Sequence, residues 1–382
     1  MTVFGTRPEA IKMAPVIVAL QSLPRFESVV TVTAQHREML DEVLNLFEIR
    51  PDFDLGIQQP LQSLAEITVR AVGGLDSVMT DIDLVAVQGD TTTTFAAALA
   101  AFYNNIPVAH IEAGLRTGDP RSPFPEEINR RLTTQLSSLH LAPTQASKAN
   151  LLSEGVSGER LVCTGNTVID ALNLAAGLKA NFADERLEIL DHDRRRVILV
   201  TVHRRESWGG GMERIGRAIA RIAADQSVLL VIPIHRNPVV RDSILPLLKG
   251  LDNVLIVEPL PYGAFVRLID RCHIVLTDSG GIQEEAPSRG KPVLVLRDNT
   301  ERPEAIDAGT AVLVGTEEDR IVRMTQEIIG DSALYERMAR AVNPYGDGHA
   351  ARRTVEAISW YFGLGARPDE FNALAGSSPP LE

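Results

Sequence analysis

Short apolar runs rich in β-branched residues alternate with helical patterns along most of this chain. Apolar residues recur at helical spacing in the segments 95–102 and 215–222. Strands that read as continuous apolar runs are buried on both faces, so the alternation predicts parallel sheets covered by helices on each side, in two α/β domains. The strand candidates are Val3–Phe4, Val29–Thr33, Leu84–Val87, Val108–Ile111, Leu139–Ala142, Val197–Val202, Val228–Ile234, Val254–Val257, Ile274–Leu276 and Val293–Leu296.

The length of 382 residues is typical of two domains. The segment 177–196 is charged and poor in apolar runs, and we place the crossover ahead of it. We therefore assign residues 1–168 to an N-terminal domain and 169–353 to a C-terminal domain. A helix expected at about 354–365 could pack on either domain, and we place it on the first. Residues 366–382 are rich in Gly, Pro and Ser and are expected to form a loose tail.

The composition argues against several classes of protein. The formal net charge of −12 argues against a nucleic-acid surface, so any anion site must be built locally. Cys163 and Cys272 are isolated and are not spaced like metal ligands, so we expect no disulfide. The chain has no apolar stretch of bilayer length and nothing that resembles a signal peptide. We therefore expect a cytoplasmic protein without a membrane or nucleic-acid partner.

The segment Thr277–Pro287 carries the most informative motif. It lies between the apolar runs Ile274–Leu276 and Pro292–Leu296, an order typical of strand, tight turn, helix and strand. Its two glycines would let a ligand approach the backbone and would present N–H donors at a helix N-terminus. Glu285 lies one helical turn further on, where its carboxylate could accept from ribose hydroxyls while the turn holds a diphosphate. The alternative is an ordinary turn with a solvated Glu-Glu pair.

Polar residues follow several of the predicted strands. Ligands of doubly wound sheets bind outside the carboxyl ends of the strands, so these positions indicate a cleft lined from both halves of the chain. A single such residue is usually a helix cap, and Asp90 before a run of threonines is a good candidate for one. The positions are Asp90, Glu112, His203, His235 and the pair Asp278-Ser279.

Three further loops carry charges that also have a plain structural explanation. Arg7 and Lys12, near the start of a predicted helix, are either phosphate contacts or solvated charges. Glu126 and Glu127 open another helix, where carboxylates stabilise the helix dipole without any further role. Arg302 follows a strand and could bind a diphosphate in a bidentate manner. Because G-x-G-x-x-G, Walker A, C-x-x-C and H-E-x-x-H motifs are all absent, we expect neither a nicotinamide cofactor nor a metal.

Up to about residue 353 the chain resembles the non-hydrolysing UDP-N-acetylglucosamine 2-epimerases of bacteria. The resemblance rests on long blocks in the family's order: FGTRPEAIKMAP, TAQHREML, GDTTTT, EAGLRTGD, SPFPEE, GNTVIDAL, HRRES, TDSGGIQEEAPSRGKPVL, TERPEA and NPYGDG. It implies two Rossmann-like doubly wound domains of the glycosyltransferase-B type, facing across a cleft, and a homodimer. The implied reaction interconverts UDP-N-acetylglucosamine and UDP-N-acetylmannosamine, and the latter serves surface polysaccharide synthesis.

The resemblance also implies roles for individual residues. The catalytic residues would be Asp90, Glu112, Glu126 and His203. The substrate would be bound by Arg7, Lys12, Phe265, Ser279, Gly280, Gly281, Glu285 and Arg302, with His203 also at the nucleotide. The chain departs from the family's usual pattern at Gln88, Val202 and Leu260, which could alter the rate or the recognition of the base.

The implied chemistry can be tested against the residues. The hydrogen on sugar C2 is not next to a carbonyl, so its inversion needs either transient oxidation or elimination of UDP across C1–C2. The missing dinucleotide motif favours elimination, and the resemblance implies that this elimination proceeds through 2-acetamidoglucal. A helix N-terminus and cations would assist departure of the diphosphate, while a carboxylate or histidine moves the proton. The identity of the base stays open, as do two other functions on this architecture: a UDP-sugar glycosyltransferase and a non-catalytic sugar-nucleotide sensor.

A regulatory site for a second UDP-N-acetylglucosamine is also implied by the resemblance. The matching positions are Gln35, Glu127, Arg204 and His235. Glu38 and Leu61 stand where some relatives place other polar contacts, which would weaken this site.

Overall fold

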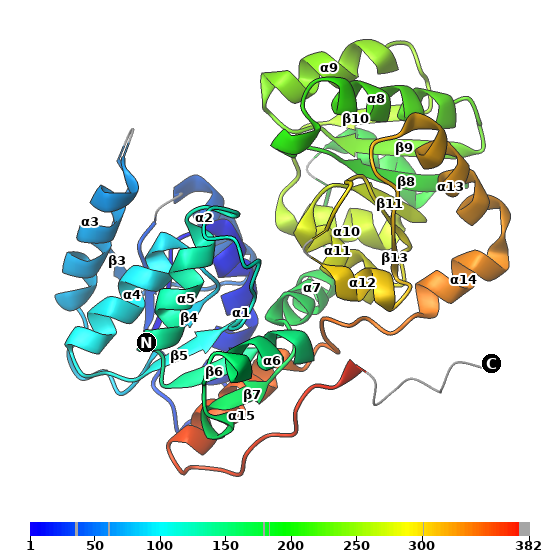
Figure 1. Ribbon diagram of the computed structural model, residues 1–382. Coiled ribbons are helices and arrows are strands. Elements are labelled where there is room, and N and C mark those ends of the chain that lie inside the picture. Colours follow the sequence, from blue (N-terminus) through cyan, green and yellow to red (C-terminus); the bar gives the residue numbers. More distant parts are fainter. Residues whose placement is uncertain (35–36, 60–61, 179, 183, 301, 374–382) are drawn as a thin grey trace. The chain divides into compact units, whose positions relative to one another are not determined.

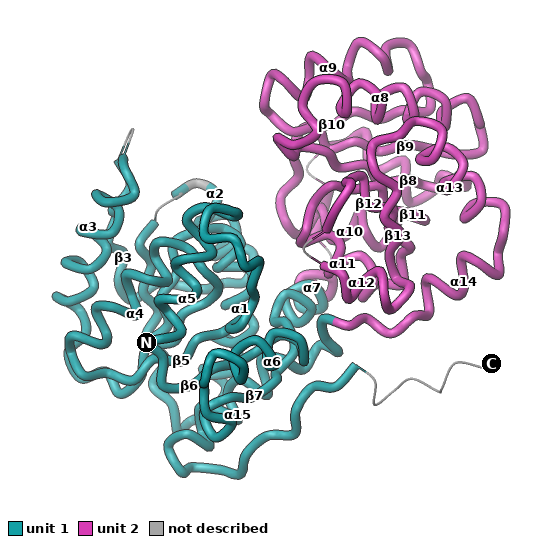
Figure 2. The backbone as a smooth tube through the Cα atoms, in the orientation of Figure 1, with its two compact units in different colours: residues 1–174, 345–375 teal, residues 175–344, 376–382 magenta. Residues whose placement is uncertain are grey.

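The computed structural model describes residues 1–34, 37–59, 62–178, 180–182, 184–300 and 302–373. It contains two compact α/β units (Figure 1). Unit 1 comprises residues 1–174 and the described residues from 345 onward, and unit 2 comprises residues 175–344 (Figure 2). The units divide the chain at 174/175 and 344/345, beside the predicted boundaries at 168/169 and 353/354.

Unit 1 is built on a fully parallel sheet of seven strands in the order β3-β2-β1-β4-β5-β6-β7. The order reverses between β1 and β4, which is the switch point where doubly wound sheets bind ligands. The strands are β1 Thr2–Phe4, β2 Val30–Val32, β3 Phe53–Asp54, β4 Val85–Gln88, β5 Val108–Ile111, β6 Leu139–Ala142 and β7 Leu161–Cys163.

The helices of unit 1 form two groups around this sheet. Helices α3, α4 and α5 pack side by side, and α1 packs against α2 and α15 (Figure 1). The α-helices are α1 Arg7–Gln21, α2 Arg37–Leu46, α3 Leu64–Asp76, α4 Thr92–Tyr103, α5 Glu126–Leu136, α6 Gln145–Ser153, α7 Thr167–Gly177, which runs into unit 2, and α15 Ala350–Tyr361, with a short 3-10 helix at Gly158–Arg160.

Unit 2 repeats this plan with a parallel sheet of six strands in the order β10-β9-β8-β11-β12-β13, so its switch point lies between β8 and β11. The strands are β8 Arg196–Thr201, β9 Val228–Pro233, β10 Val254–Val257, β11 Ile274–Thr277, β12 Val293–Val295 and β13 Ala311–Leu313. The α-helices are α8 Gly210–Ile222, α9 Pro238–Leu248, α10 Tyr262–Arg271, α11 Gly280–Ser288, α12 Pro303–Asp307, α13 Glu318–Gly330 and α14 Ser332–Arg340, with 3-10 helices at Glu185–Asp191 and Arg205–Ser207. The predicted α/β class is therefore confirmed for both units. None of the helices in the described ranges is long and apolar enough to cross a bilayer.

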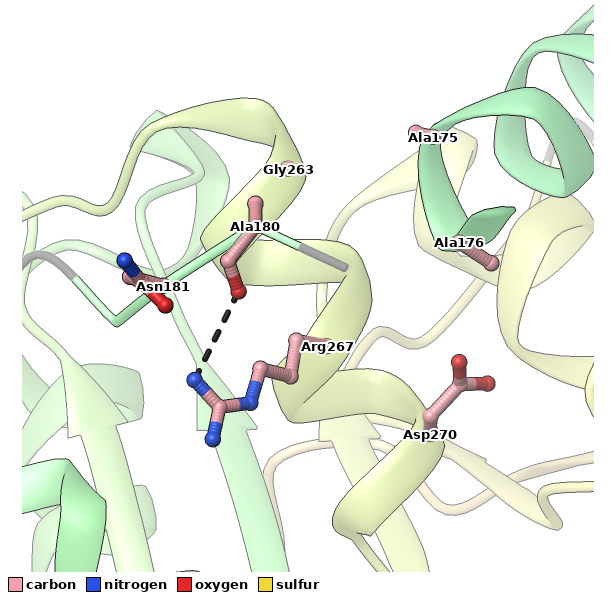
Figure 3. Close-up of a pocket in the computed structure, with 7 residues that line it drawn as sticks. All are labelled: Ala175, Ala176, Ala180, Asn181, Gly263, Arg267 and Asp270. Atoms are coloured by element: carbon pink, nitrogen blue, oxygen red, sulfur yellow. Dashed lines mark hydrogen bonds between the residues drawn. The ribbon is translucent and has the colours of Figure 1, made fainter. Parts of the chain in front are cut away.

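The charged segment between α7 and β8 is held against α10 by two arginines, Arg267 and Arg271, and Arg271 donates to the Leu190 and Asp193 carbonyls. The Arg267 guanidinium carbon lies 4.0 Å from the centroid of the Phe182 ring, and Arg267 Nη2 lies 2.6 Å from an Asp191 oxygen. Arg267 also lines a cavity of about 360 Å³ together with Ala180 and residues of α7 and α10 (Figure 3). This segment thus forms a packed part of unit 2.

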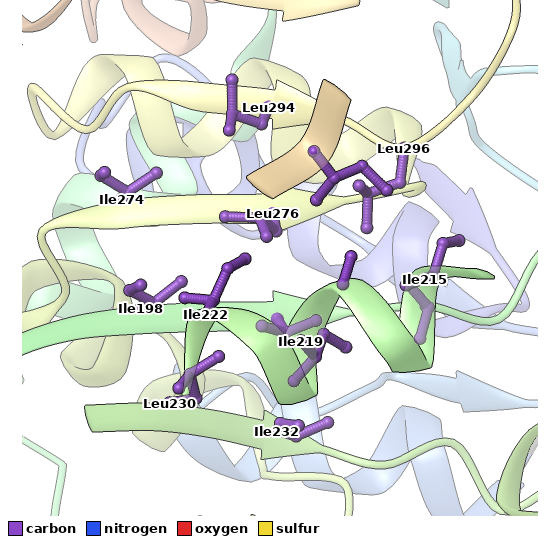
Figure 4. Packing of buried hydrophobic residues seen from close by; sticks show 14 of the residues in the cluster. Ile198, Ile215, Ile219, Ile222, Leu230, Ile232, Ile274, Leu276, Leu294 and Leu296 are labelled. Carbon is purple, nitrogen blue, oxygen red and sulfur yellow. The ribbon is translucent and has the colours of Figure 1, made fainter. Parts of the chain in front are cut away.

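The core of unit 2 explains why its strands read as continuous apolar runs. Ile215, Ile219 and Ile222 form one buried face of α8, and they pack over strand residues such as Leu230 and Leu276 (Figure 4). Their spacing of three and four residues places them on the same helix face. The predicted helical pattern at 215–222 is therefore confirmed.

The segment after α15 makes contacts that its composition does not predict. The Phe371 side chain is buried in unit 1, and Phe371 N donates to the Cys163 carbonyl at 2.8 Å beside the edge strand β7. Arg367 donates to the Leu161 carbonyl at 2.7 Å, and Lys148 pairs with Glu370 at 2.5 Å. A loose tail is expected over 366–382, whereas residues 367–371 are fixed by one apolar anchor and two charges.

Candidate functional site

Glu112 lies at the carboxyl end of β5 and is buried. Its φ of +63° falls in the left-handed region that residues with a Cβ seldom adopt, and such conformations cluster at functional sites. Lys12 Nζ from α1 lies 2.5 Å from Glu112 Oε2, and Gln88 Nε2 donates to the same oxygen. Two predicted site residues therefore form an ion pair, and Gln88, a position of departure from the family, is a second donor to its carboxylate.

Asp90 follows β4 in the turn at the switch point and is held by Arg130 of α5. Arg130 donates to Asp90 Oδ2 from Nε at 3.1 Å and from Nη2, and Asn129 donates to the Asp90 carbonyl at 3.0 Å. Burial raises the pKa of Asp90, the Arg130 charge opposes the rise, and the Glu112 charge adds to it. A carboxyl with a raised pKa near a second carboxylate is suited to proton transfer.

The two carboxylates that open α5 differ sharply in their surroundings. Glu127 is fully buried and accepts from the backbone N–H groups of Thr117–Gly118 at 3.1 and 3.4 Å. It also pairs with Arg130 at 3.2 Å and Arg131 at 3.1 Å. Glu126, the first residue of α5, is only partly buried. Glu127 therefore fixes the loop that leads into α5, and Glu126 is the more accessible carboxylate.

In unit 2, Asp278 joins the loops that follow β8 and β11. Its side chain is fully buried, and Oδ2 accepts from the backbone N–H groups of His203 and Arg204, both at 2.8 Å. Oδ1 lies 3.1 Å from His203 Nδ1. Burial would raise the pKa of Asp278, but the hydrogen bonds and charge of His203 outweigh it and lower that pKa. Asp278 thus holds His203 in place at the switch point.

His235 follows β9 and stacks on His203, with ring centroids 5.7 Å apart and planes at 23°. His235 Nδ1 accepts from the Asn237 N–H at 3.2 Å, which places the proton of the neutral ring on Nε2. Burial lowers the pKa of His235, and the neighbouring His203 charge lowers it further. The two rings therefore form a stacked pair at the carboxyl edge of unit 2.

The predicted phosphate turn lies at the N-terminus of α11. Ser279 is the residue before the helix, and its N–H donates to Thr277 Oγ1 at 2.9 Å. An ideal Cβ on Gly280 would lie 3.7 Å from Arg204 Nη2, so the guanidinium approaches this helix end. Gly281 is exposed, and a Cβ there would meet nothing within 4 Å. Free backbone space, a helix dipole and a cation together suit a diphosphate.

The other predicted substrate residues of unit 2 lie on or beside α10 and α11. Glu285 is largely buried in α11, one turn from the phosphate turn. Arg302, which precedes α12, donates from Nε to Glu284 of α11, and this contact anchors the cation to α11. Phe265 lies on α10 and is partly exposed.

Several other predicted residues have a definite place in the structure. Arg7 is the first residue of α1, and its Nη2 lies 3.7 Å from Glu42. Val202 and Leu260 are both buried apolar residues. Gln35 and Leu61, and the side chain of Glu38, lie outside the described part of the chain. None of the predicted residues lines the cavity beside Arg267. Within the described ranges no group of His, Cys, Asp or Glu is arranged to hold a metal.

Two residues at these edges, Arg130 and Glu9, are not predicted as site residues, and Asp278 is predicted at a strand end without a role. Arg130 binds Asp90, Asp278 binds His203, and Glu9 binds the loops after β1 and β4. The signal for Glu9 was present, because Thr-x-x-Glu at 6–9 is a capping-box pattern. The contact of Arg130 joins positions 40 residues apart, and spacing along the chain gives no sign of it.

Comparisons with known proteins agree on one family. A family model described as UDP-N-acetylglucosamine 2-epimerase matches residues 18–359. The UDP-N-acetylglucosamine 2-epimerase of Escherichia coli (strain K12) is 53% identical over 372 residues, which cover 94% of this chain and 97% of that protein. The Yersinia pestis protein of the same name is 54% identical over 368 residues, 94% of this chain and 97% of that protein. A crystal structure of UDP-GlcNAc 2-epimerase from Neisseria meningitidis bound to UDP-GlcNAc is 53% identical, with a TM-score of 0.83 and coverage of 94% and 98%.

Proposed function

The chain belongs to the UDP-N-acetylglucosamine 2-epimerase family, and on this premise we propose that it interconverts UDP-N-acetylglucosamine and UDP-N-acetylmannosamine without net hydrolysis. The observation that carries the proposal is the 53% identity with the Escherichia coli enzyme over 94% of the chain. An alignment of this length takes in residues of both units.

The reaction proceeds by elimination and re-addition of UDP. UDP leaves C1 with the bonding electrons while C2 loses its proton, and 2-acetamidoglucal forms. UDP then adds back to C1, and a proton returns to the other face of C2, so all atoms are conserved and no oxidant is needed. The lack of a dinucleotide motif supports this route over transient oxidation.

Departure of UDP is assisted from unit 2. The N–H groups at the start of α11 and the Arg204 guanidinium favour the charge that develops on the diphosphate. Arg7, Lys12 and Arg302 add positive charge, with Lys12 already paired to Glu112 and Arg302 to Glu284. Glu285 accepts from the ribose, and Phe265 lies against the nucleoside.

Proton transfer falls to Asp90, Glu112, Glu126 and His203. Contact with Lys12 and Gln88 favours the ionised form of Glu112, which suits a base. The raised pKa of Asp90, caused first by burial and opposed by Arg130, suits the return of a proton. We leave open which residue acts on each face of C2.

The test is to incubate UDP-N-acetylglucosamine with the purified protein alone, in deuterium oxide, without added nicotinamide or metal. The expected result is UDP-N-acetylmannosamine that carries deuterium at C2. An ¹⁸O label placed between C1 and the β-phosphorus should scramble into non-bridging positions, because UDP departs and returns. Conversion without deuterium at C2 and without scrambling of the ¹⁸O label would contradict elimination.

The same incubation separates the alternatives. A glycosyltransferase would leave the substrate unchanged until an acceptor is added, and a sensor would bind it without turnover. Dependence of turnover on NAD or a metal, after chelation and removal of bound nucleotide, would overturn the cofactor-free route.

Regulation by a second UDP-N-acetylglucosamine is part of the proposal. Support comes from His235, which stacks on His203 and has no role in the proposed chemistry. Progress curves from UDP-N-acetylmannosamine alone should show a lag that trace UDP-N-acetylglucosamine removes, and His235→Ala should weaken this response. Glu127 is a poorer test position because its carboxylate already fixes the Thr117–Gly118 loop.

We also propose a homodimer that acts in the cytoplasm and supplies UDP-N-acetylmannosamine for surface polysaccharide. Support for self-association comes from large apolar side chains exposed on the neighbouring helices α3 and α4: Val69, Phe102 and Tyr103. Sedimentation should give a dimer, and Phe102→Glu should shift it towards monomer.

A further inference from the structure

A buried carboxylate, Glu9 of α1, ties together the two loops at the switch point of unit 1. Glu9 is only 1% exposed. Its Oε2 accepts from Gly5 N at 3.1 Å, Thr6 N at 2.8 Å and Thr6 Oγ1 at 2.7 Å. Its Oε1 accepts from Thr91 Oγ1 at 2.6 Å and Thr94 Oγ1 at 3.0 Å. One oxygen therefore binds the loop after β1, and the other binds the turn after β4.

Helix capping explains only half of this arrangement. Ser63 and Glu66 form the same capping box at the start of α3, where Glu66 Oε2 accepts from Ser63 N at 2.8 Å and Ser63 Oγ at 2.9 Å. Glu66 is exposed, and these bonds stay within its own turn. Glu9 differs because it is buried and reaches threonines more than 80 positions away. A carboxylate is costly to bury, so the second set of bonds needs a reason.

The residues that Glu9 holds adjoin two residues of the proposed reaction. Thr6 precedes Arg7, which is assigned to the nucleotide, and Thr91 follows Asp90, which is assigned to proton transfer. Both loops lie at the carboxyl edge, on adjacent strands β1 and β4. Their separation is thus spanned by the two oxygens of a single side chain.

We propose that Glu9 is a positioning residue for the reaction, which fixes the nucleotide-binding Arg7 and the catalytic Asp90 relative to each other. The proposal rests on the proposed function for its kinetic consequence. A displacement of about 1 Å can cost roughly 100-fold in rate, so loosening either loop should be felt in turnover.

The test compares Glu9→Gln with the matched control Glu66→Gln. The glutamine has the same shape but is neutral, so its oxygen binds the Gly5 and Thr6 N–H groups more weakly. Its NH₂ group then requires the Thr91 and Thr94 hydroxyls to accept instead of donate. Glu9→Gln should lower kcat/KM roughly 10–100-fold, whereas Glu66→Gln, which loses an equivalent capping bond, should stay within about two-fold of wild type. In the double variant, the losses in kcat/KM caused by Arg7→Ala and Glu9→Gln should not add, because coupled residues fail additivity.

Amide hydrogen exchange in the ligand-free protein gives a readout that does not depend on catalysis. Exchange at Gly5 and Thr6 should accelerate in Glu9→Gln and should be unchanged in Glu66→Gln. If the wild type fails to epimerise, the proposed function is wrong, yet exchange still decides whether Glu9 holds the loop. If Glu9→Gln does not fold, Thr91→Val replaces it, because this change removes a bond to Oε1 and leaves the capping box at Thr6 intact. Wild-type turnover in a folded Glu9→Gln variant, or strict additivity with Arg7→Ala, would overturn the proposal.

Discussion

Replacement of Asp278 should loosen unit 2 at its switch point and slow turnover. Its Oδ2 accepts two backbone N–H groups at 2.8 Å, and the side chain is fully buried. In Asp278→Ala both N–H groups lose their acceptor, and each such loss costs about 1–3 kcal/mol, so we expect the free energy of unfolding to fall by about 2–6 kcal/mol. Asp278→Asn keeps one oxygen but makes both bonds neutral, which should cost about 1–3 kcal/mol.

Urea titration of the full chain measures the free energy of unfolding, and steady-state kinetics measures turnover. Asp278→Asn should lower kcat at least roughly 10-fold at saturating substrate, because the ring of His203 loses a partner at 3.1 Å. Asp225→Asn is a matched control, since Asp225 is exposed and accepts one backbone N–H, from Ser227 at 2.8 Å. This control should stay within about 0.5 kcal/mol of wild type.

The pH dependence gives a further check on Asp278. The pKa of Asp278 is lowered on folding from an ordinary value of 3.8, because bonding and charge from His203 outweigh the effect of burial. A carboxyl with a lowered pKa stabilises the fold above its unfolded pKa, and this contribution is lost as the pH falls through its folded pKa. The stability difference between wild type and Asp278→Asn should therefore be constant from neutral pH to about 4 and shrink below it. The reasoning would be refuted if Asp278→Ala lowered the free energy of unfolding by less than about 1 kcal/mol, or if it kept wild-type turnover.

Three further changes test other parts of the structure. Gly5→Ala should destabilise the fold by about 1–3 kcal/mol in urea titration, because a Cβ would lie 2.1 and 2.6 Å from two buried threonine hydroxyls. The control Gly73→Ala, where a Cβ meets nothing within 4 Å, should stabilise the fold by about 0.5–1 kcal/mol. Lys12→Met should lower kcat more than it weakens UDP binding measured by calorimetry, because Lys12 Nζ lies 2.5 Å from the Glu112 carboxylate; an equal loss of both would contradict this. Burial lowers the His110 pKa from 6.5 to about 4, so the unfolded chain takes up this proton first as the pH falls. Between pH 7 and 5 the free energy of unfolding of wild type should fall by about 2 kcal/mol more than that of His110→Gln, and equal falls would refute this.

The strands that the sequence predicts are mostly interior strands of the two sheets. Interior parallel strands are buried on both faces, so their sequences are continuous apolar runs such as Val197–Val202. The strands that the pattern misses, β3, β7 and β13, are all edge strands of two or three residues. Both residues of β3 are exposed, and only pairing with β2 identifies them as a strand. Two or three residues are too few to stand out as an apolar run, even in β7, whose residues are all buried.

The candidate site shows the same division between local and long-range information. The positions of Asp90, Glu112 and His203 follow from where apolar runs end, because parallel strands bring their carboxyl ends to one edge. The partners of these residues depend on how distant elements pack. Lys12 and Glu112 are 100 positions apart, and His203 and Asp278 are 75 apart. Spacing along the chain predicts which residues reach an edge and leaves open which of them meet.

The two units solve one structural problem in the same way. Each needs to hold together two loops that follow neighbouring strands at a switch point, and each uses a buried carboxylate that accepts from backbone N–H groups. In unit 1 this residue is Glu9, and in unit 2 it is Asp278. A carboxylate suits the task because it accepts several hydrogen bonds at once and strengthens each by its charge. Isosteric amides keep the volume and lose this capacity, so Glu9→Gln and Asp278→Asn should impair turnover far more than similar changes at exposed caps.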